Sequence, residues 1–263
     1  MLFYNKNTIK AREMNYSFDN LIDLDLAGVR WELSDTPVIV GAGNTKETIP
    51  ATNRTSTTMV VPPISPIAPM SLETAESMAM RPSEVNALIR MIGEFNHPLR
   101  SGATNVVLPH LASNPNGVLI ITDIPGSDDD ATGNVLSGAA GELMDKMLGA
   151  IGMTREEVSI VPLLFWRTPG GRSATRNELD LSRPFVNRLI EFISPNIIVT
   201  LGDLAAMEIG AINLSRSHGF ISEMAGNIKI VPIYHPNYIL LKPDIKRDVW
   251  NTLQTIQNML KNQ

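Results

Sequence analysis

The stretch GVLIITDIPGSDDD, residues 117–130, decides the fold, because it joins an apolar run to a cluster of carboxylates. VLIIT, residues 118–122, has the continuous apolar character of a strand buried on both faces of a sheet. Asp123 follows directly, and in open α/β sheets ligands bind where such strands end. Two interpretations of Asp123 stay open: it takes part in chemistry at the strand end, or it only forms the Pro-Gly turn that follows.

Downstream of this strand, apolar runs and helical patterns alternate along the chain. Further strands are expected at 159–166, 196–202 and 229–235, although Pro162 weakens the first of these. Helices are expected at 82–95, 138–152, 183–194 and 246–260. This alternation predicts a three-layer α/β/α sandwich with a central, mostly parallel four-stranded sheet.

Three parts of the chain differ in composition. Residues 1–35 contain SFDNLIDLDLAGVRW, whose apolar spacing predicts an N-terminal helical segment. Residues 36–80 are rich in Thr, Pro and Ser without a sustained period, which is typical of a flexible linker. Residues 81–263 hold the strand and helix patterns and are expected to form the α/β domain.

The composition of the 263 residues excludes several classes of site. The absence of cysteine rules out disulfides, thiolate nucleophiles and cysteine-ligated metal or iron–sulfur sites. The formal charge of −5 means that any DNA binding depends on a local basic patch. No apolar run approaches the ~20 residues that span a bilayer, and no signal peptide is recognised. We expect a cytoplasmic monomer without membrane contact.

Polar groups follow three of the expected strands. Asp123 follows the first, the arginine-rich stretch WRTPGGRSATR (166–176) follows the second, and His235 follows the last, within YHPNYIL (234–240). Since the carboxyl ends of parallel strands lie on one edge of a sheet, we expect these groups to share a crevice. A histidine before proline is more often structural than catalytic, and an arginine-rich loop is often only surface.

The remaining motifs do not indicate a particular class of function. The acidic run 128–130 is interpreted as a solvated loop or helix cap rather than a metal site. No GxxxxGK[ST] loop, GxGxxG motif or HExxH pair is present. The residues alone therefore indicate an α/β protein with a polar crevice.

Taken together, the segments resemble the uracil-DNA glycosylase superfamily, specifically its family 4, over roughly residues 84–260. TDIPGSDDDATGNVLSGAAG is similar to the family's GEAPG segment and PFVGxAG loop, and VSIVPLLFWRTPGGRSAT to the stretch that ends in RPPGNRTPT. SPNIIVTLGDLAA is similar to PxVIVxLGxxAA, and YHPNYILLKP to HPxYLL.

The resemblance implies roles for individual residues. Asp123 stands where the family has a glutamate that positions or activates water, and His235 matches the histidine that donates a hydrogen bond to the departing base. Leu136 replaces the phenylalanine that stacks on the flipped base, and Pro162 replaces the asparagine that recognises the uracil edge. The implied base pocket consists of Ile124, Pro125, Gly126, Leu136 and Pro162.

The resemblance also concerns a [4Fe-4S] cluster that family 4 enzymes normally carry. Its four cysteine positions are held here by His97, Arg100, Trp166 and Ser182. We therefore expect no cluster, no metal and no other cofactor. Residues 95–101 are expected to pack near Trp166 and Ser182, with the indole filling the space of the cluster.

DNA that contains a damaged or deaminated base is the expected partner. The candidate DNA-binding residues are Arg167, Arg172, Arg176, Asn237 and Lys242. The leading hypothesis is a hydrolase of base excision repair that cleaves the N-glycosidic bond of uracil or a related base. The alternatives are an impaired glycosylase-fold module that binds DNA or a protein, and a pocket for a free nucleobase or nucleotide.

Overall fold

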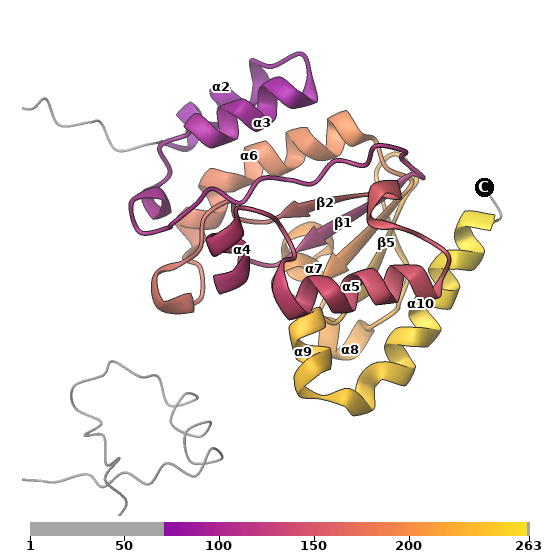
Figure 1. The fold of residues 1–263 in the computed structure, drawn as a ribbon. Coiled ribbons are helices and arrows are strands. Elements are labelled where there is room, and N and C mark those ends of the chain that lie inside the picture. Colours follow the sequence, from indigo (N-terminus) through magenta and orange to yellow (C-terminus); the bar gives the residue numbers. More distant parts are fainter. Residues whose placement is uncertain (1–70, 262–263) are drawn as a thin grey trace, which may run out of the picture. The chain divides into compact units, whose positions relative to one another are not determined.

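One sheet organises the part of the chain that the computed structural model describes, residues 71–261. Its strands run in the order β2-β1-β3-β5-β4 (Figure 1). They are β1 (Val118–Thr122), β2 (Val158–Pro162), β3 (Ile197–Leu201), β4 (Ser222–Met224) and β5 (Ile228–Ile233). All neighbours pair in parallel except β4 with β5, which are antiparallel. The mostly parallel α/β sheet is thus confirmed, while the predicted count of four strands misses β4.

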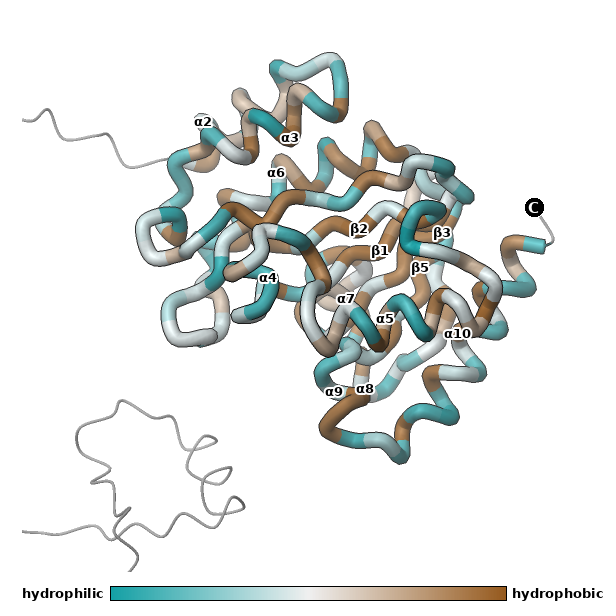
Figure 2. Tube along the Cα trace, viewed as in Figure 1, coloured by the Kyte–Doolittle hydropathy of each residue, from teal (hydrophilic) through white to brown (hydrophobic). Residues whose placement is uncertain are grey.

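The three strands β1, β2 and β3 are buried along their whole length, as their apolar sequences require. Figure 2 shows this as continuous hydrophobic colour through the centre of the fold. Pro162 is tolerated because it is the last residue of β2, which lies at the edge of the sheet. Pro232 lies in β5 beyond the residues that pair with β4.

Helices cover both faces of the sheet, as predicted for a three-layer sandwich. They are α2 (Leu72–Met80), α3 (Val85–Glu94), α4 (Ser127–Thr132), α5 (Gly138–Ala150), α6 (Arg176–Ile193), α7 (Asp203–Gly210), α8 (Leu214–Ser217), α9 (Pro236–Leu241) and α10 (Lys246–Lys261). Short 3₁₀ helices are η2 (Pro98–Ser101), η3 (Arg155–Glu157), η4 (Pro169–Gly171) and η5 (Pro243–Ile245). No helix of these described residues is long and apolar enough to cross a membrane.

Two apolar clusters lie on the two faces of the sheet, one on each. The first joins one side of the sheet to α2, α3, α6 and α7, and the second joins the other side to α5, α9 and α10. Figure 1 shows α2, α3 and α6 on one side of the strands, with α5 and α10 on the other. Alternate residues of β1 belong to alternate clusters, so each strand position fixes the face that its side chain reaches.

Several segments differ from their predicted form. The end of the predicted linker 36–80 is helical, since Ser71 caps α2 by accepting a hydrogen bond from the Thr74 backbone N–H at 3.2 Å. Helix α6 begins seven residues earlier than predicted, because Thr175 and Glu178 form a capping box. The predicted N-terminal helical segment 1–35 lies outside the described residues.

Candidate functional site

The carboxyl ends of four strands lie in a row at one edge of the sheet. Thr122 ends β1 and lies in register with Pro162 of β2 and Leu201 of β3. Leu201 in turn is in register with Ile233 of β5. Backbone bonding continues one step further, since the Asp123 N–H donates to the Leu201 carbonyl at 3.2 Å. Polar residues that follow these strands therefore emerge side by side.

The carboxylate of Asp123 packs against the start of α7. Its Oδ1 accepts a hydrogen bond from the Ala205 N–H at 2.6 Å. Gly202 has φ +102°, and a Cβ there would lie 2.0 Å from Asp123 Oδ2, so only glycine allows this approach. Burial raises the pKa of Asp123 to about 7, opposed by the Ala205 hydrogen bond. The side chain thus both caps a helix and titrates near neutrality.

His235 is held at both ring nitrogens. It precedes α9, and its Nδ1 accepts from the Asn237 N–H at 3.2 Å. A neutral ring that accepts at Nδ1 carries its proton on Nε2, so Nε2–H donates to Thr122 Oγ1 at 3.1 Å. Burial lowers the pKa of His235 to about 4, opposed by the charge of Asp129. The imidazole is therefore neutral at pH 7.

The two candidate catalytic groups approach the edge from opposite faces. Ile121 belongs to the first apolar cluster and Ile120 to the second, so Thr122 follows Ile120 toward the α5 and α9 face. Asp123 turns to the α7 face, where it meets Ala205. Since His235 bonds to Thr122, the residue before Asp123, the strand end of β1 lies between the imidazole and the carboxylate.

The acidic run forms α4 rather than a free loop. Asp128, Asp129 and Asp130 occupy its first turn, where helix geometry favours negative charge. The Asp129 carboxylate accepts from the Gly126 N–H at 2.9 Å and the Ser137 N–H at 2.7 Å, which ties together both ends of the 126–137 segment. Among residues 71–261 no group of three or more His, Cys, Asp or Glu side chains is arranged to hold a metal ion.

Leu136 lies in that segment under backbone constraint. It is buried and has φ +51°, a left-handed conformation that is unusual for a residue other than glycine. The Arg155 guanidinium holds it there by donating to the Val135 carbonyl at 3.1 Å and the Leu136 carbonyl at 3.0 Å. The position that the resemblance assigns to base stacking is thus fixed by the protein itself.

The remaining residues of the implied base pocket are placed around the β1 and β2 ends. Pro162 pairs with Thr122 and is buried, as is Pro125, whereas Ile124 and Gly126 are partly exposed. Pro162 offers no side-chain donor or acceptor to a base.

Two of the predicted DNA-binding arginines have partners within the described chain. Arg172 forms a bidentate pair with Glu178, at 2.9 and 2.5 Å, and this contact lowers the pKa of Glu178 to about 2. Arg176 donates to Glu208 and Asp180 at 2.8 Å. Arg167 forms no ion pair within residues 71–261, so of the three it is the cation most available to a phosphate.

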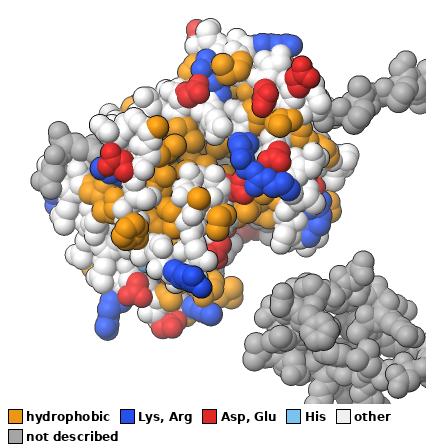
Figure 3. Space-filling view, turned by 180° about the vertical axis from the view of Figure 1, so that it is seen from behind, with side chains coloured by type: hydrophobic (Ala, Val, Ile, Leu, Met, Phe, Trp, Pro, Cys, Tyr) orange, Lys and Arg blue, Asp and Glu red, His pale blue; other side chains and the backbone are white. Residues whose placement is uncertain are grey.

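Helix α9 presents a mixed apolar and basic surface. Leu241 is 80% exposed, and Leu240 and Tyr238 are exposed beside it. Lys242 lies 5.1 Å from the centroid of the Tyr238 ring, and Asn237 is exposed at the start of the helix. The face seen in Figure 3 shows exposed hydrophobic side chains across its centre, with Lys, Arg, Asp and Glu side chains scattered around them.

Aromatic side chains pack together at the positions that the resemblance assigns to the iron–sulfur cluster. Trp166 is fully buried, and the His97 ring stacks on it with centroids 4.8 Å apart and planes 6° apart. The ring centroids of Phe95 and Trp166 lie 6.2 Å apart, so the segment 95–101 packs at Trp166 as expected. Ser182 is fully buried nearby in α6, and its Oγ has no hydrogen-bond partner within the described chain.

These residues do not fit a cluster. A [4Fe-4S] centre needs thiolate ligands, and the chain has no cysteine. His97 uses both nitrogens elsewhere: Nδ1 accepts from the Leu99 N–H at 3.2 Å, and Nε2 lies 3.0 Å from the Glu178 carbonyl. Burial lowers the pKa of His97, so the ring is neutral and donates to that carbonyl.

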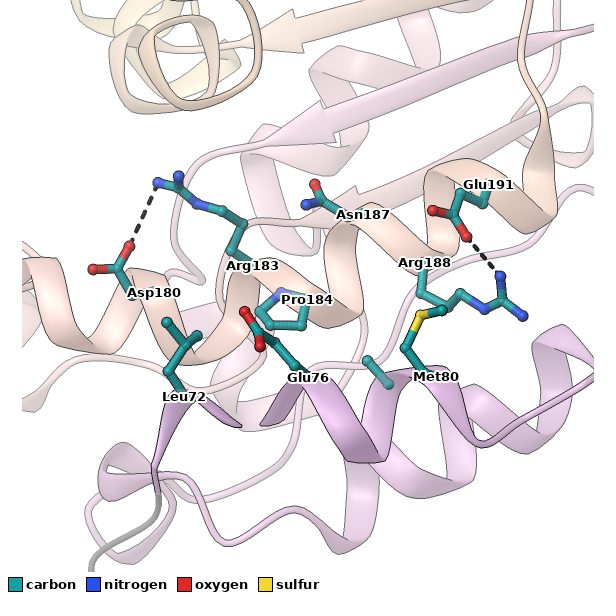
Figure 4. A pocket seen from close by; sticks show the side chains of 10 residues that line it. Leu72, Glu76, Met80, Asp180, Arg183, Pro184, Asn187, Arg188 and Glu191 are labelled. Carbon is teal, nitrogen blue, oxygen red and sulfur yellow. Dashed lines mark hydrogen bonds and ion pairs between the residues drawn. The ribbon is translucent and has the colours of Figure 1, made fainter. Parts of the chain in front are cut away.

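A cavity of about 400 Å³ lies between α2 and α6 (Figure 4). Glu76 and Met80 line it from α2, and Pro184 lies opposite on α6. Arg183 and Arg188 at its wall pair with Asp and Glu side chains of the same helix. None of the predicted site residues lines this cavity.

Three residues at the site were not predicted from the sequence. The sequence pattern identifies Thr122 only as the last residue of a strand and Asp129 only as part of an acidic run, and the predicted site does not include Glu178. The capping pattern Thr175-x-x-Glu178 is the one signal that indicates a role for any of them.

Comparisons with known proteins agree with this architecture. Residues 109–254 match the model of the uracil DNA glycosylase superfamily. A type-4 uracil-DNA glycosylase of Archaeoglobus fulgidus is 32% identical over 159 residues, which are 57% of this chain and 79% of that protein. One of Thermotoga maritima is 28% identical over 171 residues, 63% of this chain and 88% of that protein.

A DNA polymerase of Bacillus phage SP01 is also similar, with 25% identity over 146 residues that make up 55% of this chain and 16% of the polymerase. The matched region of this chain contains β1 to β5 and both candidate catalytic residues. The chain belongs to the uracil-DNA glycosylase superfamily.

Proposed function

We propose that this protein hydrolyses the N-glycosidic bond of a deaminated base in DNA, with Asp123 and His235 as its catalytic groups. The observation that carries the proposal is the hydrogen bond from His235 Nε2 to Thr122, the residue before Asp123. It brings a neutral donor and a carboxylate to one strand end, and hydrolysis of this bond needs both groups.

The carboxylate acts on the sugar side of the bond. As the C–N bond breaks, positive charge develops on the sugar, which a carboxylate stabilises while it orients the attacking water. The Ala205 N–H fixes the carboxylate of Asp123 at the end of β1. Because the pKa is about 7, a large share of the side chain is ionised at neutral pH.

The imidazole acts on the base side. Negative charge develops on the departing base, and an N–H donor held close to it stabilises that charge. His235 is suited to this role since it is neutral and its proton is on Nε2.

The DNA approaches along α9 in this proposal. Apolar side chains that wedge between base steps help to extrude a nucleotide, and the exposed Leu240 and Leu241 are of that type. Lys242 and Asn237 flank them, and Arg167, which follows β2 at the same carboxyl edge of the sheet, supplies a further cation.

In this proposal the protein releases bases other than uracil, either in addition to it or in place of it. A base edge is read by hydrogen bonds, and Pro162 supplies none from its side chain. Leu136 is buried and lacks the aromatic ring whose stacking on a base typically contributes ~1–3 kcal/mol. Uracil, hypoxanthine and xanthine in DNA are therefore the three candidate substrates.

A second candidate, a catalytically impaired module that binds DNA, is favoured by one observation. Both catalytic groups already have partners in the protein: Asp123 caps α7 and His235 donates to Thr122. Such a module keeps the α9 surface and lacks base release.

Single-turnover assays separate the two candidates. Oligonucleotides with each lesion, single- and double-stranded, are incubated with excess protein, and abasic sites are detected by alkaline cleavage. We expect release of at least one base, with a rate reduced about 100-fold or more in Asp123→Asn and His235→Asn, as for loss of one transition-state donor. Glu73→Gln is the matched control, because Glu73 is exposed on α2, away from the predicted site residues.

Absence of abasic sites with every lesion, together with salt-sensitive DNA binding, supports the binding module instead. Equal rates in wild type and in both variants contradict the assigned residues even if activity is present.

A further inference from the structure

Thr122 meets His235 at the one ring atom that the proposed reaction uses. The other nitrogen, Nδ1, is bound by the Asn237 N–H of the same helix. Pro236 at the first position of α9 keeps this cap in place, because its fixed φ favours the helix start. The ring therefore keeps one proton, on Nε2, and that proton points to Thr122 Oγ1 at 3.1 Å.

The hydroxyl of Thr122 is a rigid acceptor. Thr122 is 4% exposed and lies in the middle of the sheet, in register with Pro162 and Leu201 on its two sides. Its carbonyl accepts from the Leu163 N–H at 3.0 Å, which fixes the backbone, and a β-branched side chain has few χ1 rotamers. The segment TDIPG thus begins with a hydroxyl where the similar GEAPG begins with glycine.

We propose that Thr122 is a positioning residue: its hydroxyl accepts from the Nε2–H of His235 and so holds the ring at the strand end beside Asp123 until the departing base takes the hydrogen bond. This inference rests on the proposed function and identifies a further residue of the same site. As negative charge develops on the base, the base oxygen becomes the stronger acceptor and takes the hydrogen bond. A donor that is already oriented loses little in reorganisation.

Two substitutions isolate the hydroxyl. Thr122→Val keeps the shape and removes the acceptor, whereas Thr122→Ser keeps the acceptor. We expect Thr122→Val to lower the single-turnover rate about three- to tenfold, the effect of one neutral hydrogen bond, with the half-saturating DNA concentration unchanged. Thr122→Ser should stay within about twofold of wild type. Thr122→Ala replaces the valine variant if the latter does not fold.

Nitrogen-15 NMR of the imidazole gives a readout that needs no activity. In the wild type we expect His235 in the Nε2–H form with a slowly exchanging proton. Thr122→Val should shift the Nε2 resonance and speed exchange of that proton, and Thr122→Ser should restore both. His235→Asn assigns the signals among the four histidines of the chain.

Three outcomes overturn the inference. An unchanged Nε2 signal in Thr122→Val shows that the contact is absent, and a faster rate shows that the hydroxyl competes with the base. If the wild type releases no base from any lesion, the proposed function fails, and a catalytic role for Thr122 fails with it. The NMR comparison distinguishes that failure from loss of the contact itself.

Discussion

The molecule builds the same local structure around two histidines and uses it differently. His97 and His235 each precede a proline, cap a short helix, and accept at Nδ1 from the backbone N–H two residues on, at 3.2 Å in both cases. Burial lowers the pKa of both. The His-Pro sequence therefore sets the tautomer, and it alone does not tell a structural histidine from a functional one.

The difference lies at Nε2. His97 is 1% exposed, stacks on Trp166, and donates to the Glu178 carbonyl of α6. His235 is partly exposed at the sheet edge and donates to the hydroxyl of Thr122. The bond from His97 to the Glu178 carbonyl ties the segment 95–101 to α6 in the core. The bond from His235 to the Thr122 hydroxyl lies at a strand end, where a ligand can reach the imidazole.

The largest expected effect tests the structural side of this comparison. Trp166→Ala should lower the free energy of unfolding by about 3–5 kcal/mol, because it removes a fully buried indole and leaves a cavity beside His97. Trp250→Ala is the matched control: Trp250 is 39% exposed on α10, and its loss should cost about 1 kcal/mol or less. Urea denaturation measures the free energy of unfolding of both variants. Similar losses in the two would show that the stacked Trp166 and His97 rings are not part of the stabilising core.

The second prediction exchanges the two roles. Asparagine retains the ability to cap a helix, so His97→Asn and His235→Asn remove the rings with the caps kept. We expect His97→Asn to lose about 2 kcal/mol or more of stability, with base release per folded molecule retained. His235→Asn should show the reverse, stable protein with little base release. A stability loss that is equal in the two variants breaks the comparison.

The third prediction uses pH to sharpen it. Both histidines have lowered pKa values, and His235 stays neutral above about pH 4. Asp123, with its pKa raised to about 7, is then the group that titrates near neutrality. Since the carboxylate is the active form, base release should rise about tenfold per unit of pH below 7 and level off above it. A rate that falls between pH 6 and 8 assigns the titration to another group.

Much of the fold was predictable, because buried parallel strands are continuous apolar runs and amphipathic helices have a clear period. VLIIT was located to the residue. The three residues of β4, SEM, have no such pattern, and their pairing depends on the neighbouring β5. PNYILL was not among the predicted helices, but it forms α9, where the helix buries Ile239.

The site was predictable in part. Strand ends indicated where Asp123 and His235 emerge, since parallel topology alone brings such ends to one edge. Thr122 was not recognisable, because a threonine at the end of a buried strand is common and its partner is 113 residues away. The pairing of Arg172 with Glu178 was not predictable either, because Glu178 lies in the first turn of α6, before the start of the predicted helix 183–194.

The most direct test follows the four histidine rings by nitrogen-15 NMR while an oligonucleotide with the base that the wild type releases is added to the Asp123→Asn variant, in which we expect the base to stay attached. We predict that the Nε2 resonance of His235 shifts as its donor turns from Thr122 to the base, and that the His97 resonances stay unchanged. A His235 signal that does not move at saturating DNA, or a His97 signal that moves as far, contradicts the assignment of one histidine to the site and the other to the core.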